Sequence, residues 1–156
     1  MKNQLIYGKS AEKERFIAGI SRRMIIFAWS NKISRMIGLT HTSQLTVTDA
    51  VTAVTMGSGD MPVLATPAMM ALMENAAMLA VADHLPDGYT TVGGHIASSH
   101  LKPSKLGDTV TASATVTGVD GKKIEFKVQA HCGDVLLGEG THLRFIVDRN
   151  KFMSRL

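Results

Sequence analysis

Apolar and polar residues alternate along much of the chain after residue 44, in segments whose length and composition predict β-strands. The first segment is 45–54 (LTVTDAVTAV), which is rich in β-branched residues. Four further strand-like segments lie at 90–101, 108–119, 122–132 and 135–147. The pairs Asp120-Gly121 and Gly133-Asp134 are typical of hairpin turns between the last three segments. These four segments can therefore form an antiparallel meander.

A long apolar segment, 66–85 (TPAMMALMENAAMLAVADHL), separates the first strand from the others and predicts a helix. Thr66 is expected to cap its N-terminus, and Pro67 suits the first helical position, where no N–H is needed. Glu74 and Asn75 are the polar residues of its interior. A helix that is apolar nearly all round is expected to be enclosed. An antiparallel sheet curled around this one helix satisfies the order of elements, so we predict an α+β protein with the hotdog fold.

The composition narrows the class of protein. A chain of 156 residues suits one domain with a real core. Its single cysteine, Cys132, excludes an internal disulfide and a zinc site built on thiolates, and it indicates a reducing, cytoplasmic location. The six histidines show no metal-ligand spacing, so we expect neither a metal nor another cofactor.

The net charge of +4 is unevenly distributed along the chain. Residues 1–35 hold eight lysines and arginines against two glutamates, whereas the remainder holds nine basic and eleven acidic residues. A slightly acidic domain without a basic stripe is a poor nucleic-acid binder, so no nucleic-acid partner is expected. No stretch approaches the ~20 apolar residues of a membrane span, so we expect no membrane-spanning segment.

Residues 1–35 form a basic extension before a predicted domain of residues 36–156. Apolar residues within 16–27 recur at roughly helical spacing, which suits an amphipathic helix at a surface or a membrane. An organellar targeting peptide is a second interpretation, although the two glutamates are unusual in one. The third, which we favour because the domain pattern needs nothing before it, is that the natural protein begins at Met36.

Glu74 is the most informative single residue for function. A carboxylate within an apolar helix is costly to bury unless it is paired, hydrogen-bonded or protonated, and such groups are often used in acid–base catalysis. A structural interpretation has equal weight at this point. In that interpretation Glu74 lies at an exposed edge of the helix, or at a subunit seam beside a basic partner.

Thr66 and His100 are weaker signals when each is taken singly. N-capping alone explains Thr66, although a hydroxyl at a helix N-terminus also suits a site where negative charge develops. His100 ends a strand-like segment, where a neutral imidazole could activate water or a hydroxyl. The histidines at His84, His131 and His142 have the character of ordinary strand or helix-end positions.

The pair Gly93-Gly94 lies inside a predicted strand, where glycine is disfavoured unless a backbone or a ligand approaches closely. We therefore expect a bulge at this point, or an exposed N–H that donates to a thioester carbonyl. Both glycines are candidate substrate-binding residues.

Three separated motifs occur in this order: VLATPAMMALMENAA, TTVGGHIASSHLKPSKLGDTV and GEGTHLRFIVDRNKF. Through them, residues 45–155 resemble the fluoroacetyl-CoA thioesterase-like family of hotdog proteins. The resemblance implies hydrolysis of a short-chain acyl-CoA thioester to the free acid and CoA. It also implies a homodimer or higher oligomer with the active site near the subunit interface. The CoA thioester is then the substrate, and no cofactor is implied.

The same resemblance assigns roles to individual residues. It makes Thr66, Glu74 and His100 the catalytic residues. It makes Gly93 the residue that positions the thioester, with Gly94 beside it.

One departure from the family affects the expected substrate. The fluoroacetyl-specific member gates its pocket with aromatic residues before the Ala-Thr-Pro motif. The matching stretch here, VTMGSGDMPVLA, contains Met56 and Met61 but no aromatic residue. We therefore expect Met61 to contact the substrate, and a broader or different short-acyl specificity.

Two other functions compete with thioester hydrolysis. Hotdog hydratases and dehydratases of acyl thioesters usually carry their histidine before the central helix. Here MPVLATP occupies that place and His100 follows the helix, which favours hydrolysis. The second competitor is a non-catalytic acyl-CoA-binding protein, because a fold by itself does not establish a reaction.

Overall fold

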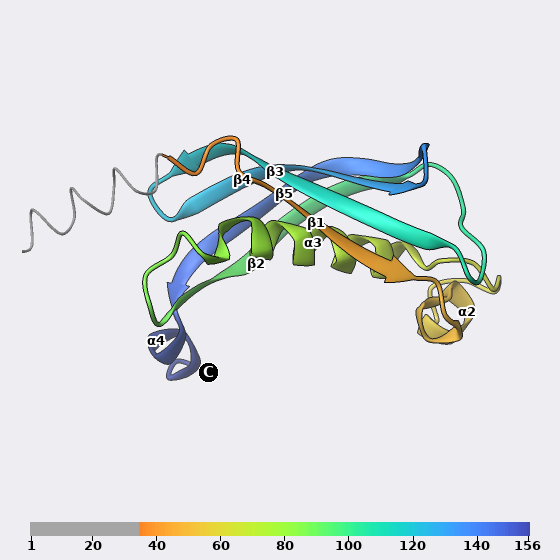
Figure 1. Ribbon diagram of the computed structural model, residues 1–156. Coiled ribbons are helices and arrows are strands. Elements are labelled where there is room, and N and C mark those ends of the chain that lie inside the picture. Colours follow the sequence, from red (N-terminus) through yellow and green to blue (C-terminus); the bar gives the residue numbers. More distant parts are fainter. Residues whose placement is uncertain (1–34) are drawn as a thin grey trace, which may run out of the picture. The chain divides into compact units, whose positions relative to one another are not determined.

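The computed structural model describes residues 35–156, so the interpretations of the basic extension concern residues that lie almost wholly outside the described part. Met36–Leu156 form one compact unit. The strands are β1 (Thr40–Thr46), β2 (Tyr89–His100), β3 (Thr109–Asp120), β4 (Lys123–Cys132) and β5 (Val135–Asp148). The helices are α2 (Ala53–Met56), α3 (Thr66–Ala82) and α4 (Arg149–Met153), with a 3-10 turn, η1 (Asp49–Val51). Figure 1 shows the strands curving across one side of α3.

The strands form one antiparallel sheet in the order β1-β3-β4-β5-β2. β3, β4 and β5 make the expected meander, with turns in which Gly121 and Gly133 adopt φ angles of 56° and 54° that glycine tolerates readily. The prediction that β2 joins the meander beside β3 is wrong. β2 pairs with β5, from Tyr89↔Asp148 to His100↔Gly138, and lies at the edge of the sheet. Tight turns dictate the pairing of neighbouring strands, whereas the longer connection after β2 does not.

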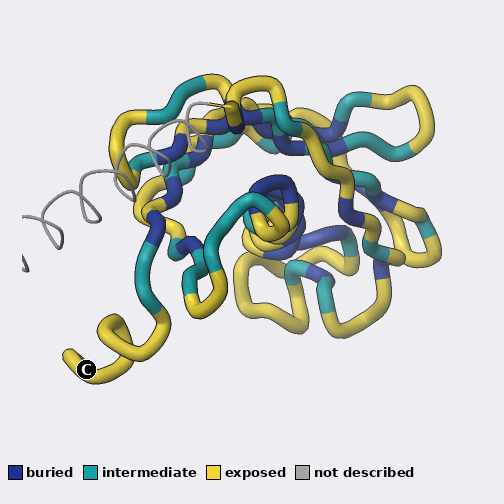
Figure 2. The backbone as a smooth tube through the Cα atoms, turned by 60° about the vertical axis from the view of Figure 1, so that its left-hand side comes forward, coloured by how far each residue is buried: buried dark blue, intermediate teal, exposed yellow. Residues whose placement is uncertain are grey.

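α3 lies in the concave face of the sheet, and Figure 2 shows the sheet arching over it. Its buried side chains are Ala68, Met69, Leu72, Met73, Ala76, Ala77, Ala80 and Val81. A second stripe of the helix, which includes Pro67, Ala71 and Leu79, is exposed. The prediction of an enclosed helix therefore holds within this chain only for the side that faces the sheet.

The strand predicted over 45–54 ends at Thr46, and the rest of that segment forms η1 and α2. The Thr52 hydroxyl donates to the Asp49 carbonyl (2.8 Å) and accepts from the Thr55 N–H (3.4 Å). Local threonine-to-backbone bonds of this kind compete with strand pairing, which explains the incorrect prediction. The Ala65 N–H then donates to the Val51 carbonyl (2.9 Å), so this segment packs beside the start of α3.

Candidate active site

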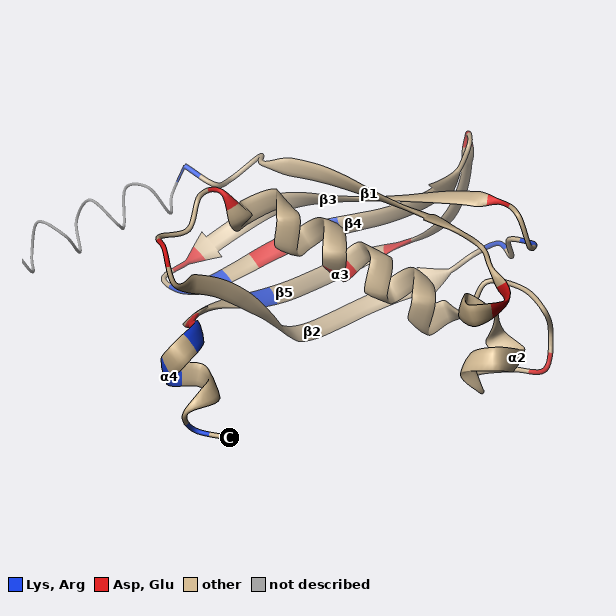
Figure 3. Cartoon of the chain, turned by 60° about the horizontal axis from the view of Figure 1, so that its bottom comes forward, with Lys and Arg blue, Asp and Glu red and all other residues tan. Residues whose placement is uncertain are grey.

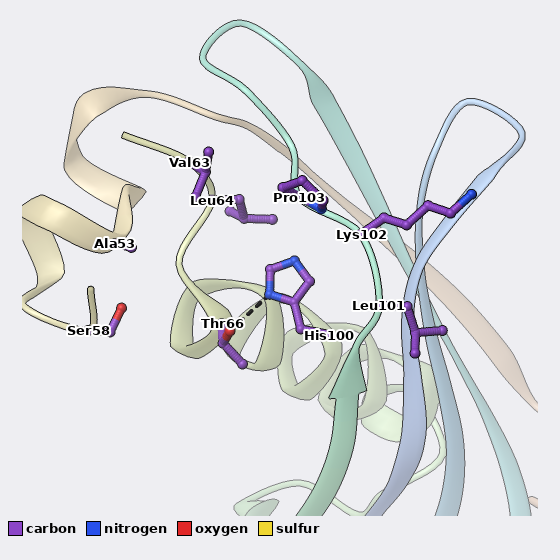
Figure 4. Close-up of a pocket in the computed structure, with 9 residues that line it drawn as sticks. All are labelled: Ala53, Ser58, Val63, Leu64, Thr66, His100, Leu101, Lys102 and Pro103. Carbon is purple, nitrogen blue, oxygen red and sulfur yellow. Dashed lines mark hydrogen bonds between the residues drawn. The ribbon is translucent and has the colours of Figure 1, made fainter. Parts of the chain in front are cut away.

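Thr66 begins α3 but does not cap it. The N-cap is Ala65, which makes no side-chain capping bond, and Thr66 is the first helical residue. The predicted cap is therefore displaced by one residue. Because the helix does not use the Thr66 hydroxyl as its cap, that hydroxyl is available to His100, whose Nδ1 lies 2.9 Å from Thr66 Oγ1. Figure 4 shows this contact as a dashed line.

Thr66 and His100 face a pocket of about 300 Å³ between the start of α3, the end of β2 and the segment that contains α2. The pocket is lined by Ala53, Ser58, Val63, Leu64, Thr66, His100, Leu101, Lys102 and Pro103. This volume is at the small end of the range for ligand sites. Met61, which we expected to contact the substrate, is not in this lining and is 59% exposed.

The electrostatics of His100 suit a proton acceptor. Burial lowers the pKa of its imidazole, and the backbone of Lys102 acts more weakly in the opposite direction. The imidazole is therefore neutral at pH 7. The Nε2 atom of His100 is buried, and among residues 35–156 no group forms a well-directed hydrogen bond with it.

Glu74 belongs to a second group of residues. Eight residues separate it from Thr66, which corresponds to about 12 Å along the helix. Glu74 faces the first half of β2, where a Cβ atom added to Gly93 would lie 2.6 Å from Glu74 Oε1. Only glycine fits there without displacing the carboxylate. The Glu74 side chain is 41% exposed, and no other residue of α3 is charged, as Figure 3 shows.

The bulge expected at Gly93-Gly94 is confirmed, because the register of β2 against β5 shifts between Gly93 and His95. The two glycines face different neighbours. Gly93 faces Glu74, whereas a Cβ atom on Gly94 would collide with the aromatic ring of Phe145. Phe145 follows Arg144 on β5 and so points to the opposite face of the sheet. Gly94 thus contributes room for the bulge and does not face Glu74.

Two residues of the Glu74 group escaped the sequence analysis. His142 and Arg144 lie on β5 and are only 2% and 7% exposed. His142 Nε2 lies 3.6 Å from Glu74 Oε1, and Arg144 Nη1 donates to the Glu74 carbonyl at 3.4 Å. His142, interpreted from the sequence as an ordinary strand position, is a strand residue that lies buried beside Glu74. The available signal was a histidine and an arginine at alternate positions of β5, because such positions share a face of the sheet.

The structure thus brings the predicted residues together as two groups. Thr66 contacts His100, and Glu74 contacts the Gly93 region. His100 and Gly93 are seven residues apart on one extended strand, which is about 20 Å. A single chain therefore does not gather all three predicted catalytic residues around one point.

Two absences concern residues 35–156, the part of the chain that the structure describes. No helix in that range is long and apolar enough to cross a membrane. In the same range, no three histidine, cysteine, aspartate or glutamate side chains are grouped as metal ligands.

Comparison with known proteins defines the class. The family model described as fluoroacetyl-CoA-specific thioesterase matches residues 47–150. A fluoroacetyl-CoA thioesterase of Streptantibioticus cattleyicolor is 35% identical over 94 residues, which are 60% of this chain and 68% of that relative. A solved structure of a fluoroacetyl-CoA-specific thioesterase has a TM-score of 0.71 at 30% identity, over 76% of this chain and 93% of that one. A thioesterase-superfamily protein of Thermus thermophilus shares the fold, with a TM-score of 0.71 at 24% identity over 76% and 88% of the two chains.

The fold and the family match define a thioester hydrolase with the hotdog fold. More narrowly, the chain belongs to the fluoroacetyl-CoA-specific thioesterase family. The predicted fold and the predicted acyl-CoA thioesterase class are confirmed at this level.

Proposed function

We propose that this protein hydrolyses a short-chain acyl-CoA thioester to the free acid and CoA. The 2.9 Å contact between Thr66 Oγ1 and His100 Nδ1 in the pocket carries the proposal. A hydroxyl beside a neutral imidazole is an arrangement that activates an oxygen nucleophile. The similarity to a fluoroacetyl-CoA thioesterase of Streptantibioticus cattleyicolor supports the substrate class. The proposed chemistry uses side chains and water, with no metal or other cofactor.

In the proposed mechanism, His100 accepts a proton as an oxygen nucleophile attacks the thioester carbonyl. The same base serves attack by Thr66 or by a water molecule. The backbone N–H groups at the start of α3 stabilise the negative charge on the carbonyl oxygen, and the Gly93 bulge adds to them where a second copy of the chain brings it to the same site. The C–S bond then breaks, and the imidazolium returns its proton to the departing CoA thiolate. Attack by water gives the free acid directly, whereas attack by Thr66 leaves an acyl-threonine ester, which a water molecule activated by His100 then hydrolyses to the acid and the free hydroxyl.

We propose a homodimer with composite active sites, because the two groups of residues are separated in one chain. β2 is an edge strand, so one side of its backbone is open to another strand. Antiparallel pairing of two β2 strands, centred between Gly93 and His100, would bring the Glu74 group of one copy to the His100 of the other. The exposed stripe of α3 would supply apolar area for the same contact.

The pocket lining also bears on the acyl group. Among the residues that line it, none is aromatic, and the apolar part comes from small or aliphatic side chains such as Ala53, Val63 and Leu64. We infer a range of short acyl groups wider than fluoroacetyl alone. The single cysteine supports a reducing, cytoplasmic location as part of the same proposal.

The pH dependence of hydrolysis follows from the lowered pKa of His100. A protonated imidazole cannot accept the proton of the nucleophile, so activity falls as the pH drops through this pKa. Because burial lowers the pKa, we expect kcat/KM to remain level near pH 7 and to decline only below the ordinary histidine value of about 6.5. A pH profile of kcat/KM checks this, and an acid limb centred above pH 7 would contradict it.

A thiol-release assay over acyl-CoAs of increasing chain length tests the proposed function directly. We expect rapid CoA release from acetyl-, propionyl- and fluoroacetyl-CoA, and slower release as the acyl chain outgrows the pocket. If CoA esters bind and stay intact, the protein is an acyl-CoA-binding protein. A parallel assay with a short enoyl-CoA detects water addition to the double bond, and a hydratase would change that substrate without releasing thiol.

A further inference from the structure

His142 is buried close to Glu74, and the proposed mechanism gives it no role. Its ring is 2% exposed and lies on the inward face of β5, between the bulge of β2 and the Arg144 guanidinium. An imidazole in such a place must satisfy both of its nitrogens, because an unpaired buried polar atom is costly.

The two hydrogen bonds of His142 determine its tautomer. Its Nδ1 lies 2.7 Å from the His95 carbonyl oxygen, which can only accept, so Nδ1 carries the proton. Its Nε2 lies 3.1 Å from Arg144 Nη1, which can only donate, so Nε2 is an unprotonated acceptor. The ring is therefore neutral, and burial lowers its pKa, consistent with this state. The 3.6 Å approach of Nε2 to Glu74 Oε1 is consequently not an ion pair.

Arg144 extends this connection to β2 and to α3. Its Nε donates to the Thr91 hydroxyl and its Nη2 to the Thr91 carbonyl, both at 2.8 Å. Its Nη1 also reaches the Glu74 carbonyl at 3.4 Å. Thr91 and the Glu74 carbonyl thus accept three hydrogen bonds from the guanidinium, and His142 accepts the fourth.

The bulge and the Glu74 carboxylate meet at the same point. A Cβ atom on Gly93 would lie 2.6 Å from Glu74 Oε1, 3.4 Å from His142 Cε1 and 3.8 Å from Arg144 Nη1. The His95 carbonyl, which accepts from His142, lies on the C-terminal side of the register shift. His142 therefore contacts both the bulge and the side chains that face it.

We propose that His142 is a positioning residue which, through its Nδ1–H bond to the His95 carbonyl and its Nε2 bond to Arg144, holds the Gly93 bulge against Glu74. This role rests on the proposed function, because the position of the bulge matters for thioester hydrolysis. A misplacement of about 1 Å near reacting groups is enough to lower a rate strongly.

Two substitutions separate the two bonds. In His142→Asn the amide nitrogen ends near the position of Nδ1, so the bond to His95 is kept and that to Arg144 is lost. In His142→Gln the amide oxygen ends near the position of Nε2, so the opposite bond is kept. We expect His142→Asn to retain kcat within about threefold, and His142→Gln to lose about tenfold or more with a smaller change in KM. The same two substitutions at His41, an exposed residue of β1, serve as matched controls.

Two measurements on the full chain are independent of turnover. A long-range proton–nitrogen correlation spectrum with isotope-labelled histidine should show His142 protonated at Nδ1 alone, and a proton on Nε2 at pH 7 would overturn the proposal. Amide exchange at Gly94 and His95 should be faster in His142→Gln than in the wild type, and it should match the wild type in His142→Asn. Equal exchange and equal loss of kcat in both variants would also overturn it. If the wild type releases no thiol, the proposed function fails, and the spectrum and exchange still test the link.

Discussion

Replacing His100 with glutamine is expected to lower kcat for the preferred short acyl-CoA by about 100-fold or more, because the proton acceptor of the nucleophile is lost. Gln retains a polar group of similar reach, so the pocket keeps its shape and KM should change little. His100 contacts Thr66 at 2.9 Å, and no other histidine has this contact. Stopped assays of initial CoA release over a range of substrate concentrations give both constants.

The matched control is His131→Gln, in which a histidine on the outward side of β4 is changed in the same way. We expect this control to keep wild-type turnover. Retention of more than about a tenth of the wild-type kcat by His100→Gln would remove His100 from the role of general base.

Replacing Glu74 with glutamine is expected to reduce turnover at least tenfold, a loss of more than about 1.4 kcal/mol of transition-state stabilisation. The substitution removes the negative charge and nearly preserves the volume beside Gly93, where little space remains. Glu139→Gln is the control, because Glu139 is an exposed carboxylate on β5. Unchanged hydrolysis of short acyl-CoAs by Glu74→Gln would exclude Glu74 from the catalytic residues.

The two inactive variants together test whether sites are shared between copies. If one site takes Thr66 and His100 from one copy and Glu74 from the other, a mixed dimer of His100→Gln and Glu74→Gln contains one intact site. Random mixing after unfolding and refolding together should then restore about a quarter of wild-type activity. If each site lies within a single chain, the mixture stays as inactive as the variants alone. Size-exclusion chromatography with light scattering establishes the oligomeric state in the same samples.

The fold was largely predictable because its main elements have strong local patterns. β3, β4 and β5 combine alternation with glycine-containing turns, and α3 is a long apolar helix. The errors fall where local pattern and long-range pairing compete. The segment after Thr46 alternates like a strand, yet threonine-to-backbone bonds turn it into η1 and α2. The place of β2 at the sheet edge also depended on contacts with the distant β5.

The sequence indicated the individual site residues to different degrees. Glu74 was distinctive because a carboxylate interrupts an apolar helix, and Gly93-Gly94 because a strand rarely contains two glycines. His142 was not distinctive, because one histidine in a strand has many uses. Its importance depends on the bulge of β2, which comes next to it in space only when the sheet forms, and on the Arg144 guanidinium, which Thr91 of β2 holds in place.

The sequence by itself determined the class of protein, since its hydrophobic periodicity and three ordered motifs are local properties of the chain. Those motifs also led to the prediction that Thr66, Glu74 and His100 are the catalytic residues. Only the tertiary structure decided how these residues are grouped. The Thr66 hydroxyl meets His100 because the end of β2 packs beside the start of α3, whereas Glu74 meets Gly93 about two turns away. Distances between residues far apart in sequence follow from strand pairing and helix packing, which no local pattern encodes.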